Sequence, residues 1–99
     1  MSKILIALDE STTCTGYAVF SDGKLIKHGL FSLKNKDVLE RVSYIMEEIE
    51  KLIKTYKPNN MIIEDVQITM NAATAKSLLG LQFMIEVYAH RHNIPCETY

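Results

Sequence analysis

The sequence predicts a single α/β domain in which an antiparallel meander leads through a helical crossover into a parallel strand. Short apolar runs at 4–8 and 61–63 have the composition of buried strands. An Asp-Gly pair at 22–23 marks a tight hairpin, and apolar residues recur at helical spacing over 38–57. A chain of 99 residues has room for one such core and not for a second lobe.

The first predicted strand ends in a carboxylate. Residues Ile4 to Leu8 form a continuous apolar run, which is typical of a strand covered on both faces, and the run stops at Asp9. Hydroxyl residues follow at 11–13. Open α/β sheets bind their ligands just beyond the carboxyl ends of the strands, so Asp9 is the first candidate functional residue. On this stretch alone, an aspartate that merely ends a strand is an equally good interpretation.

The next two strands complete the meander. The chain returns through Gly16 into a strand over Tyr17 to Phe20 and turns at the Asp-Gly pair. Residues 24–33 alternate loosely and predict a third strand, antiparallel to the second, with a bulge at Gly29.

A long helix follows a polar link. Asp37 is placed to cap its first turn, and Glu40 completes the spacing of a capping box. The apolar stripe continues to Lys57, where Pro58 stops the helix.

The strand after this helix also ends in acid. Residues 61–66 (MIIEDV) are reached through a helix, and a strand reached in this way is expected to lie parallel to the first. Asp9 and Glu64 would then leave the sheet at the same end, close enough to share a cation. Asp65 should point to the other side by strand alternation and is not included among the metal ligands.

The second predicted helix spans Ala72 to His92, with Asn71 as its cap, and it is apolar nearly all round. Such a helix needs cover on two sides, and the sheet supplies one, so we expect a subunit partner on the other. Spare apolar surface on a small domain is the simpler alternative. If a partner covers the helix, placing a charge on it, for example by Leu81→Glu, should give a monomer in sedimentation. A further strand begins at Ile94, and because the chain stops near its end we expect a longer parent protein.

Composition restricts the class of protein. The net charge of −1 and a pI near 6.3 give no overall attraction to DNA, so DNA binding would need a local basic patch or metal ions. The two cysteines, Cys14 and Cys96, lack the spacing of a zinc or redox site and are interpreted as free thiols. Neither a signal peptide nor a membrane span is evident, which favours a cytoplasmic protein.

Two carboxylates without a positioned histidine or serine fit a hard cation better than nucleophilic catalysis. Magnesium prefers oxygen ligands and keeps water molecules that substrate phosphates can replace. In two-metal phosphodiester hydrolysis, Asp9 would bridge the ions and Glu64 would hold one of them. Two ions need more ligands than two acids supply, so a third and a fourth acid are expected.

The blocks ILIALDESTTCTGYAVF, NMIIEDV, NAATA and PCETY resemble, in order and spacing, the RuvC Holliday junction resolvases of the RNase H-like nuclease superfamily. The resemblance implies an RNase H-like α/β fold over residues 1–99, lacking the C-terminal part of a resolvase. Its mixed five-stranded sheet would have strands one to three in an antiparallel meander, strands four and five parallel to strand one, and two helices.

The same resemblance implies a function. Family members are magnesium-dependent endodeoxyribonucleases that nick four-way junctions as homodimers, formed largely through the helix that matches Ala72 to His92. Manganese is expected to substitute for magnesium. Asp9 and Glu64 match the first two catalytic acids and metal ligands of the family.

The sequence departs from the family pattern in several places. The family's other acidic ligands lie on a helix after the fifth strand, and this chain ends before it. Glu10-Ser11 replaces the usual Pro-Gly, as in phage and prophage relatives, and Gln67 stands where some members carry an aromatic residue. Catalysis by these 99 residues alone therefore stays open.

Two other functions remain. An aspartate-tipped strand with a hydroxyl hairpin also resembles the phosphate-binding lobe of actin-like ATPases and sugar kinases, although that interpretation leaves Glu64 without a role. The third candidate is a non-catalytic dimerisation or DNA-binding module of RNase H-like fold.

Overall fold

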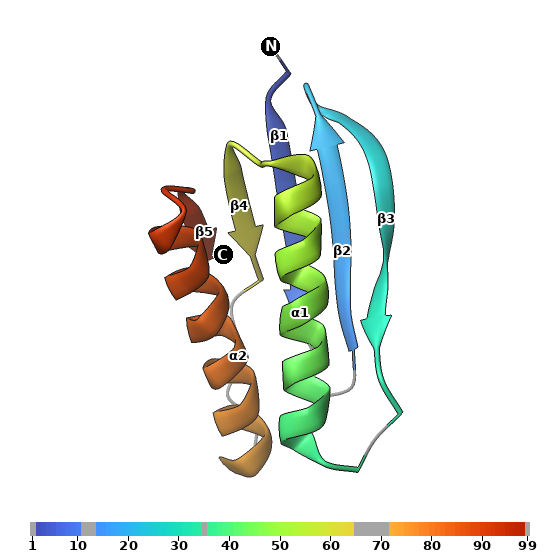
Figure 1. Ribbon diagram of the computed structural model, residues 1–99, viewed down its shortest axis with the longest axis vertical. Coiled ribbons are helices and arrows are strands. Elements are labelled where there is room, and N and C mark those ends of the chain that lie inside the picture. Colours follow the sequence, from blue (N-terminus) through green and yellow to red (C-terminus); the bar gives the residue numbers. More distant parts are fainter. Residues whose placement is uncertain (1, 11–13, 35, 65–71, 99) are drawn as a thin grey trace.

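The computed structural model describes residues 2–10, 14–34, 36–64 and 72–98. These residues form five strands and two helices in the predicted order (Figure 1). The elements are β1 (Ile4–Glu10), β2 (Cys14–Ser21), β3 (Lys24–Ser32), α1 (Val38–Tyr56), β4 (Asn60–Ile63), α2 (Ala72–Arg91) and β5 (Cys96–Thr98).

The strands form one mixed sheet in the order β3-β2-β1-β4-β5. The β1–β2 and β2–β3 pairs are antiparallel, whereas β4 runs parallel to both β1 and β5. The predicted meander and the parallel placement of the fourth and fifth strands are confirmed. β1 is the central strand, so its carboxyl end lies in the middle of one end of the sheet.

The hairpin between β2 and β3 turns as predicted, but its bulge lies elsewhere. Asp22 and Gly23 both have positive φ (49° and 83°), the conformation that an Asp-Gly turn favours. The register shifts between Val19 and Phe20, not at Gly29 as expected. Gly29 pairs regularly with Tyr17.

Close packing against Tyr17, and not a bulge, explains why position 29 is a glycine. A Cβ atom at this position would lie 2.9 Å from Cε1 and from the hydroxyl oxygen of Tyr17. The Tyr17 ring stacks on Phe31 with ring centroids 4.5 Å apart, so the ring occupies the space that a side chain at 29 would need.

Helix α1 begins and ends at its predicted signals. The Asp37 carboxylate accepts a hydrogen bond from the backbone N–H of Leu39 at 2.9 Å. At the other end, Lys57 adopts a left-handed conformation (φ 48°) and its N–H donates to the carbonyl oxygen of Ile53 at 2.8 Å. Pro58 follows directly, and the chain enters β4 two residues later.

Both helices lie in front of the sheet in Figure 1, and the core lies between these two layers. Alternate strand residues such as Ile6, Leu8 and Ile63 point into it and are fully or almost fully buried. Their neighbours Leu5 and Ala7 face the other way and are half-buried. Within the described residues, helices therefore cover β1 on one face only. Its continuous apolar run had predicted cover on both faces.

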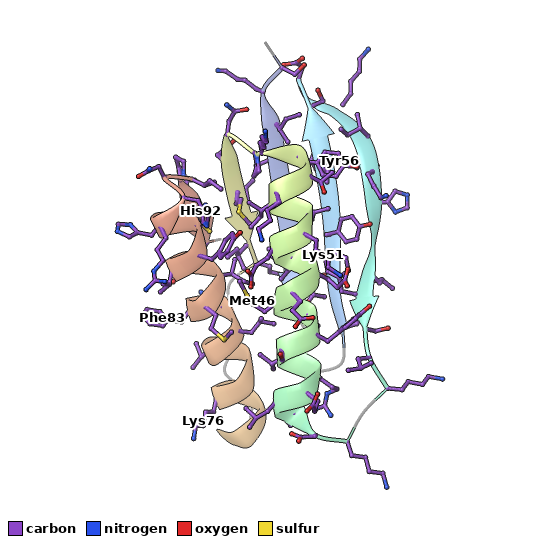
Figure 2. The ribbon with its side chains drawn as sticks, viewed as in Figure 1. Met46, Lys51, Tyr56, Lys76, Phe83 and His92 are labelled. Carbon is purple, nitrogen blue, oxygen red and sulfur yellow. The ribbon has the colours of Figure 1, made fainter. Side chains whose placement is uncertain are left out.

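Helix α2 has two different apolar faces. The core side consists of the buried residues Leu81, Ile85 and Ala89. Four large apolar residues are exposed on the rest of the helix: Leu79, Phe83, Met84 and Val87. Phe83 points outward from the helix on the side away from α1 (Figure 2). We call these four residues the α2 outer face.

Neither described helix combines the length and the apolar character that crossing a bilayer requires.

Candidate metal centre

The parallel pairing of β1 and β4 brings two acids together. The last pair in the register is Leu8 with Ile63, and the backbone N–H of Glu64 then donates to the carbonyl oxygen of Leu8 at 3.0 Å. Asp9 and Glu64 are therefore the next two residues at neighbouring strand tips, and both are exposed. The prediction that these residues leave the sheet side by side is confirmed.

The two carboxyl groups interact directly. A hydrogen bond with the Asp9 side chain raises the pKa of Glu64, and the negative charge of Asp9 and desolvation raise it further. Two ionised carboxylates have no hydrogen to share, so this contact needs a proton or a cation between them. The site thus favours a positive charge at the point where the two side chains meet.

The donor set fits a hard divalent cation. Both groups are carboxylates, which are the oxygen ligands that magnesium and manganese prefer. Asp9 is held within a regular strand pair with Gly16, and Glu64 is fixed by its backbone bond to Leu8. Among the side chains that the structure describes, no third histidine, cysteine or acid joins a metal-binding group. Two ligands would leave most of the coordination sphere of a bound ion to water or substrate.

A shallow cavity of about 260 Å³ adjoins Asp9, and sequence reasoning missed it. Its lining includes Ala7, Gly16 and Ala18. Strand pairing matches Ala7 with Ala18 and Asp9 with Gly16, so these small residues and the acid share one sheet face. The sequence signal that could have predicted this cavity is Gly16, the small residue that pairs with Asp9. The Asp9 carboxylate is exposed beside this cavity, whose lining also includes Leu8 and Tyr17.

Several predicted features lie outside the described residues. These are the hydroxyl residues at 11–13, the orientation of Asp65, the Asn71 cap, and Gln67, which stands where some family members carry an aromatic residue. They stay predictions.

The family model and the curated relatives agree on one family. The sequence model of the family "Crossover junction endodeoxyribonuclease RuvC" matches residues 5–99. The RuvC of Brachyspira hyodysenteriae is 30% identical over 101 residues, which cover 97% of this chain and 63% of that protein.

Solved structures agree on the fold. The structure of T. thermophilus RuvC in complex with a Holliday junction substrate superimposes with a TM-score of 0.82 at 15% identity, covering 98% of this chain and 64% of that one. YeaZ from Pseudomonas aeruginosa superimposes with a TM-score of 0.62 at 12% identity and is covered over 43% of its length. At these identities the likeness concerns the fold alone.

The chain is shorter than its relatives. It spans 63%, 53% and 60% of the length of three curated RuvC proteins, from Brachyspira, Fusobacterium and Dictyoglomus thermophilum. A substantial part of each relative therefore has no counterpart among these 99 residues.

Proposed function

This chain belongs to the RuvC family of crossover junction endodeoxyribonucleases, and we propose that it acts in metal-dependent hydrolysis of phosphodiester bonds in four-way DNA junctions. The observation that carries the proposal is the direct contact between the carboxyl groups of Asp9 and Glu64 at adjacent strand tips. The match of the family over residues 5–99 and the structural likeness to a junction-bound RuvC support the substrate.

Asp9 and Glu64 would hold magnesium or manganese through their carboxylate oxygens. Magnesium, when bound, supplies Lewis-acid stabilisation of the leaving oxygen and activates water. The chain's own contribution is position, because both acids are anchored by strand hydrogen bonds next to a surface of small residues. Because Asp9 is exposed beside a shallow cavity, a phosphodiester can approach it from solvent.

We further propose that the complete site needs acids beyond this pair. Asp9 and Glu64 are the candidate ligands in the described part of the chain, and a two-metal site requires more than two. The relatives are longer by roughly a third to a half of their own length, which provides room for such ligands. The net charge of −1 gives no general attraction to DNA, so the metal ions would also carry much of the affinity for the phosphate backbone.

We propose that two copies of the chain associate through the α2 outer face. Phe83 is 66% exposed and Leu79 is 46% exposed, and with Met84 and Val87 they make four large exposed apolar side chains on one helix. A second copy would remove them from water. A protein that acts on branched DNA inside the cell would be cytoplasmic, and this location remains part of the proposal.

The non-catalytic module is the second candidate, because the described residues contribute two acids where two ions need more. Such a module would keep the fold and the α2 outer face but would not cleave DNA. The likeness to YeaZ is one of fold and does not support an ATPase, because the contact between Asp9 and Glu64 has no role in binding nucleotide phosphates.

A manganese titration followed by NMR is the direct test. The paramagnetic ion should broaden the amide signals next to Asp9 and Glu64 first, and Asp9→Asn should abolish this effect. Cleavage of a labelled four-way junction in magnesium then separates the enzyme from the non-catalytic module. Broadening scattered over surface acids such as Glu47 would show that the acid pair does not assemble a metal site.

A further inference from the structure

A second cavity lies at the opposite end of the sheet from Asp9. It is formed where the carboxyl ends of α1 and α2 lie next to each other, near the start of β4 (Figure 1). Its volume is about 320 Å³, within the size range of small-molecule sites. Its apolar lining consists of Ile53, Pro58 and Ile94.

An aromatic pair forms another part of the lining. The ring of Tyr88 in α2 and the ring of His92, the residue after the helix, have centroids 4.3 Å apart and planes inclined by 32°. His92 is exposed at the carboxyl end of the helix (Figure 2). The Tyr88 hydroxyl oxygen is buried and has no hydrogen-bond partner among the described residues. The cavity therefore offers ring faces and apolar side chains to a flat ligand.

The charged residues of the lining are all cationic. Lys54 and Lys57 are exposed at the cavity and make no ion pair within the described ranges, whereas Lys51 pairs with Glu48 at 3.3 Å. No described lining residue is acidic. The carboxyl ends of two helices carry partial negative charge, about half a charge each, and two full lysine charges outweigh it. An anion is thus the favoured charged group here.

We propose that this cavity binds a nucleoside 5′-phosphate, with its base against Tyr88 and His92 and its phosphate at Lys54 and Lys57. Base stacking on aromatic rings combined with lysine contacts to phosphate is the usual chemistry of single-stranded nucleic-acid sites. The ligand is either a free nucleotide or the phosphorylated end of a DNA strand. The site is independent of Asp9 and Glu64, which lie at the other end of the sheet.

The test is an NMR titration of the chain with deoxyadenosine monophosphate in EDTA, which removes metal from the acid pair. We expect shifts of the Lys57, Tyr88 and His92 amides in the millimolar range, and about tenfold weaker binding of inorganic phosphate, because it lacks the base. Lys57→Glu should abolish the shifts. The matched control is Lys24→Glu, which makes the same charge change at an exposed lysine outside this cavity and should leave binding unchanged.

A second variant tests the rings. His92→Ala should lower the affinity for the nucleotide towards that for inorganic phosphate, without weakening phosphate itself. A short 5′-phosphorylated oligodeoxyadenosine that binds at least as tightly as the nucleotide identifies a strand end as the ligand, and weaker binding identifies the free nucleotide. Equal affinities for phosphate and nucleotide, equal losses in the two lysine variants, or no shift at millimolar concentration would each overturn the proposal.

Discussion

The carboxyl groups of Asp9 and Glu64 lie next to each other at the tips of two neighbouring parallel strands, close enough for Asp9 to raise the pKa of Glu64. This arrangement concentrates negative charge beside a shallow cavity on the sheet.

Asp9→Asn should remove metal binding and leave the fold intact. The substitution keeps the shape of the side chain, and Asp9 is exposed, so little packing is lost. Because Asp9 is one of two proposed ligands, manganese affinity should fall by at least about 10- to 100-fold, the loss typical even for groups that only support a ligand. Isothermal titration with manganese measures this, and an unchanged circular dichroism spectrum is the control. Undiminished manganese affinity would exclude Asp9 as a ligand.

Glu64→Gln should stabilise the metal-free protein at neutral pH. The pKa of Glu64 is raised in the folded state by the contact with Asp9, so the folded chain binds that proton more tightly than the unfolded chain. Stability then falls as the pH rises from the ordinary carboxyl pKa through the raised one. Above this window the wild type carries an unrelieved repulsion that the variant lacks.

Thermal melts in EDTA across this pH range measure the effect. The advantage of Glu64→Gln should vanish in acid, where both forms are neutral at this position. Magnesium should raise the melting temperature of the wild type more than that of the variant, because the ion binds the folded acid pair. A variant less stable than the wild type at neutral pH in EDTA would contradict the proposed repulsion.

Gly29→Ala should destabilise the fold. The added Cβ would lie 2.9 Å from the Tyr17 ring, which is itself stacked on Phe31, so a packed aromatic pair has to move. Overpacking of this kind costs about 1–3 kcal/mol. The matched control is Gly80→Ala in α2, where a Cβ meets nothing within 4 Å.

The control should gain about 0.5–1 kcal/mol, because alanine is the better helix former. Urea denaturation measures both changes in the free energy of unfolding. Equal effects of the two substitutions would show that the Tyr17 ring does not restrict position 29.

Phe83→Glu should convert a dimer to a monomer. Phe83 is 66% exposed on the α2 outer face, so a charge there disturbs an interface and not the core. Leu81→Glu is unsuitable for this test, because Leu81 is only 2% exposed and the variant would disrupt the core instead. Sedimentation velocity distinguishes the species.

The control for the interface is Leu25→Glu, which charges an apolar residue of β3 that is 52% exposed. It should leave the sedimentation coefficient unchanged. A wild type that sediments as a monomer at all concentrations, or equal effects of the two substitutions, would count against association through α2.

Local sequence patterns determined most of the fold and the candidate pair. The apolar runs ending at Asp9 and Glu64, the Asp22-Gly23 turn and the Asp37 cap each depend on residues close together in the chain, and the structure has all of them where they were predicted. A helical crossover between two strands makes them parallel almost by necessity, which is why two acids 55 residues apart could be placed side by side.

Only the tertiary structure decided the features that depend on distant partners. The position of the bulge depends on how β2 and β3 pair, and the need for Gly29 depends on the Tyr17 ring. The cavity at Lys57 exists only because two helices end together. Leu81 and Phe83 are both apolar residues of one helix, yet the first is buried and the second exposed. Their difference comes from which side of α2 meets the sheet, and a helix apolar all round carries no periodic signal that specifies that side.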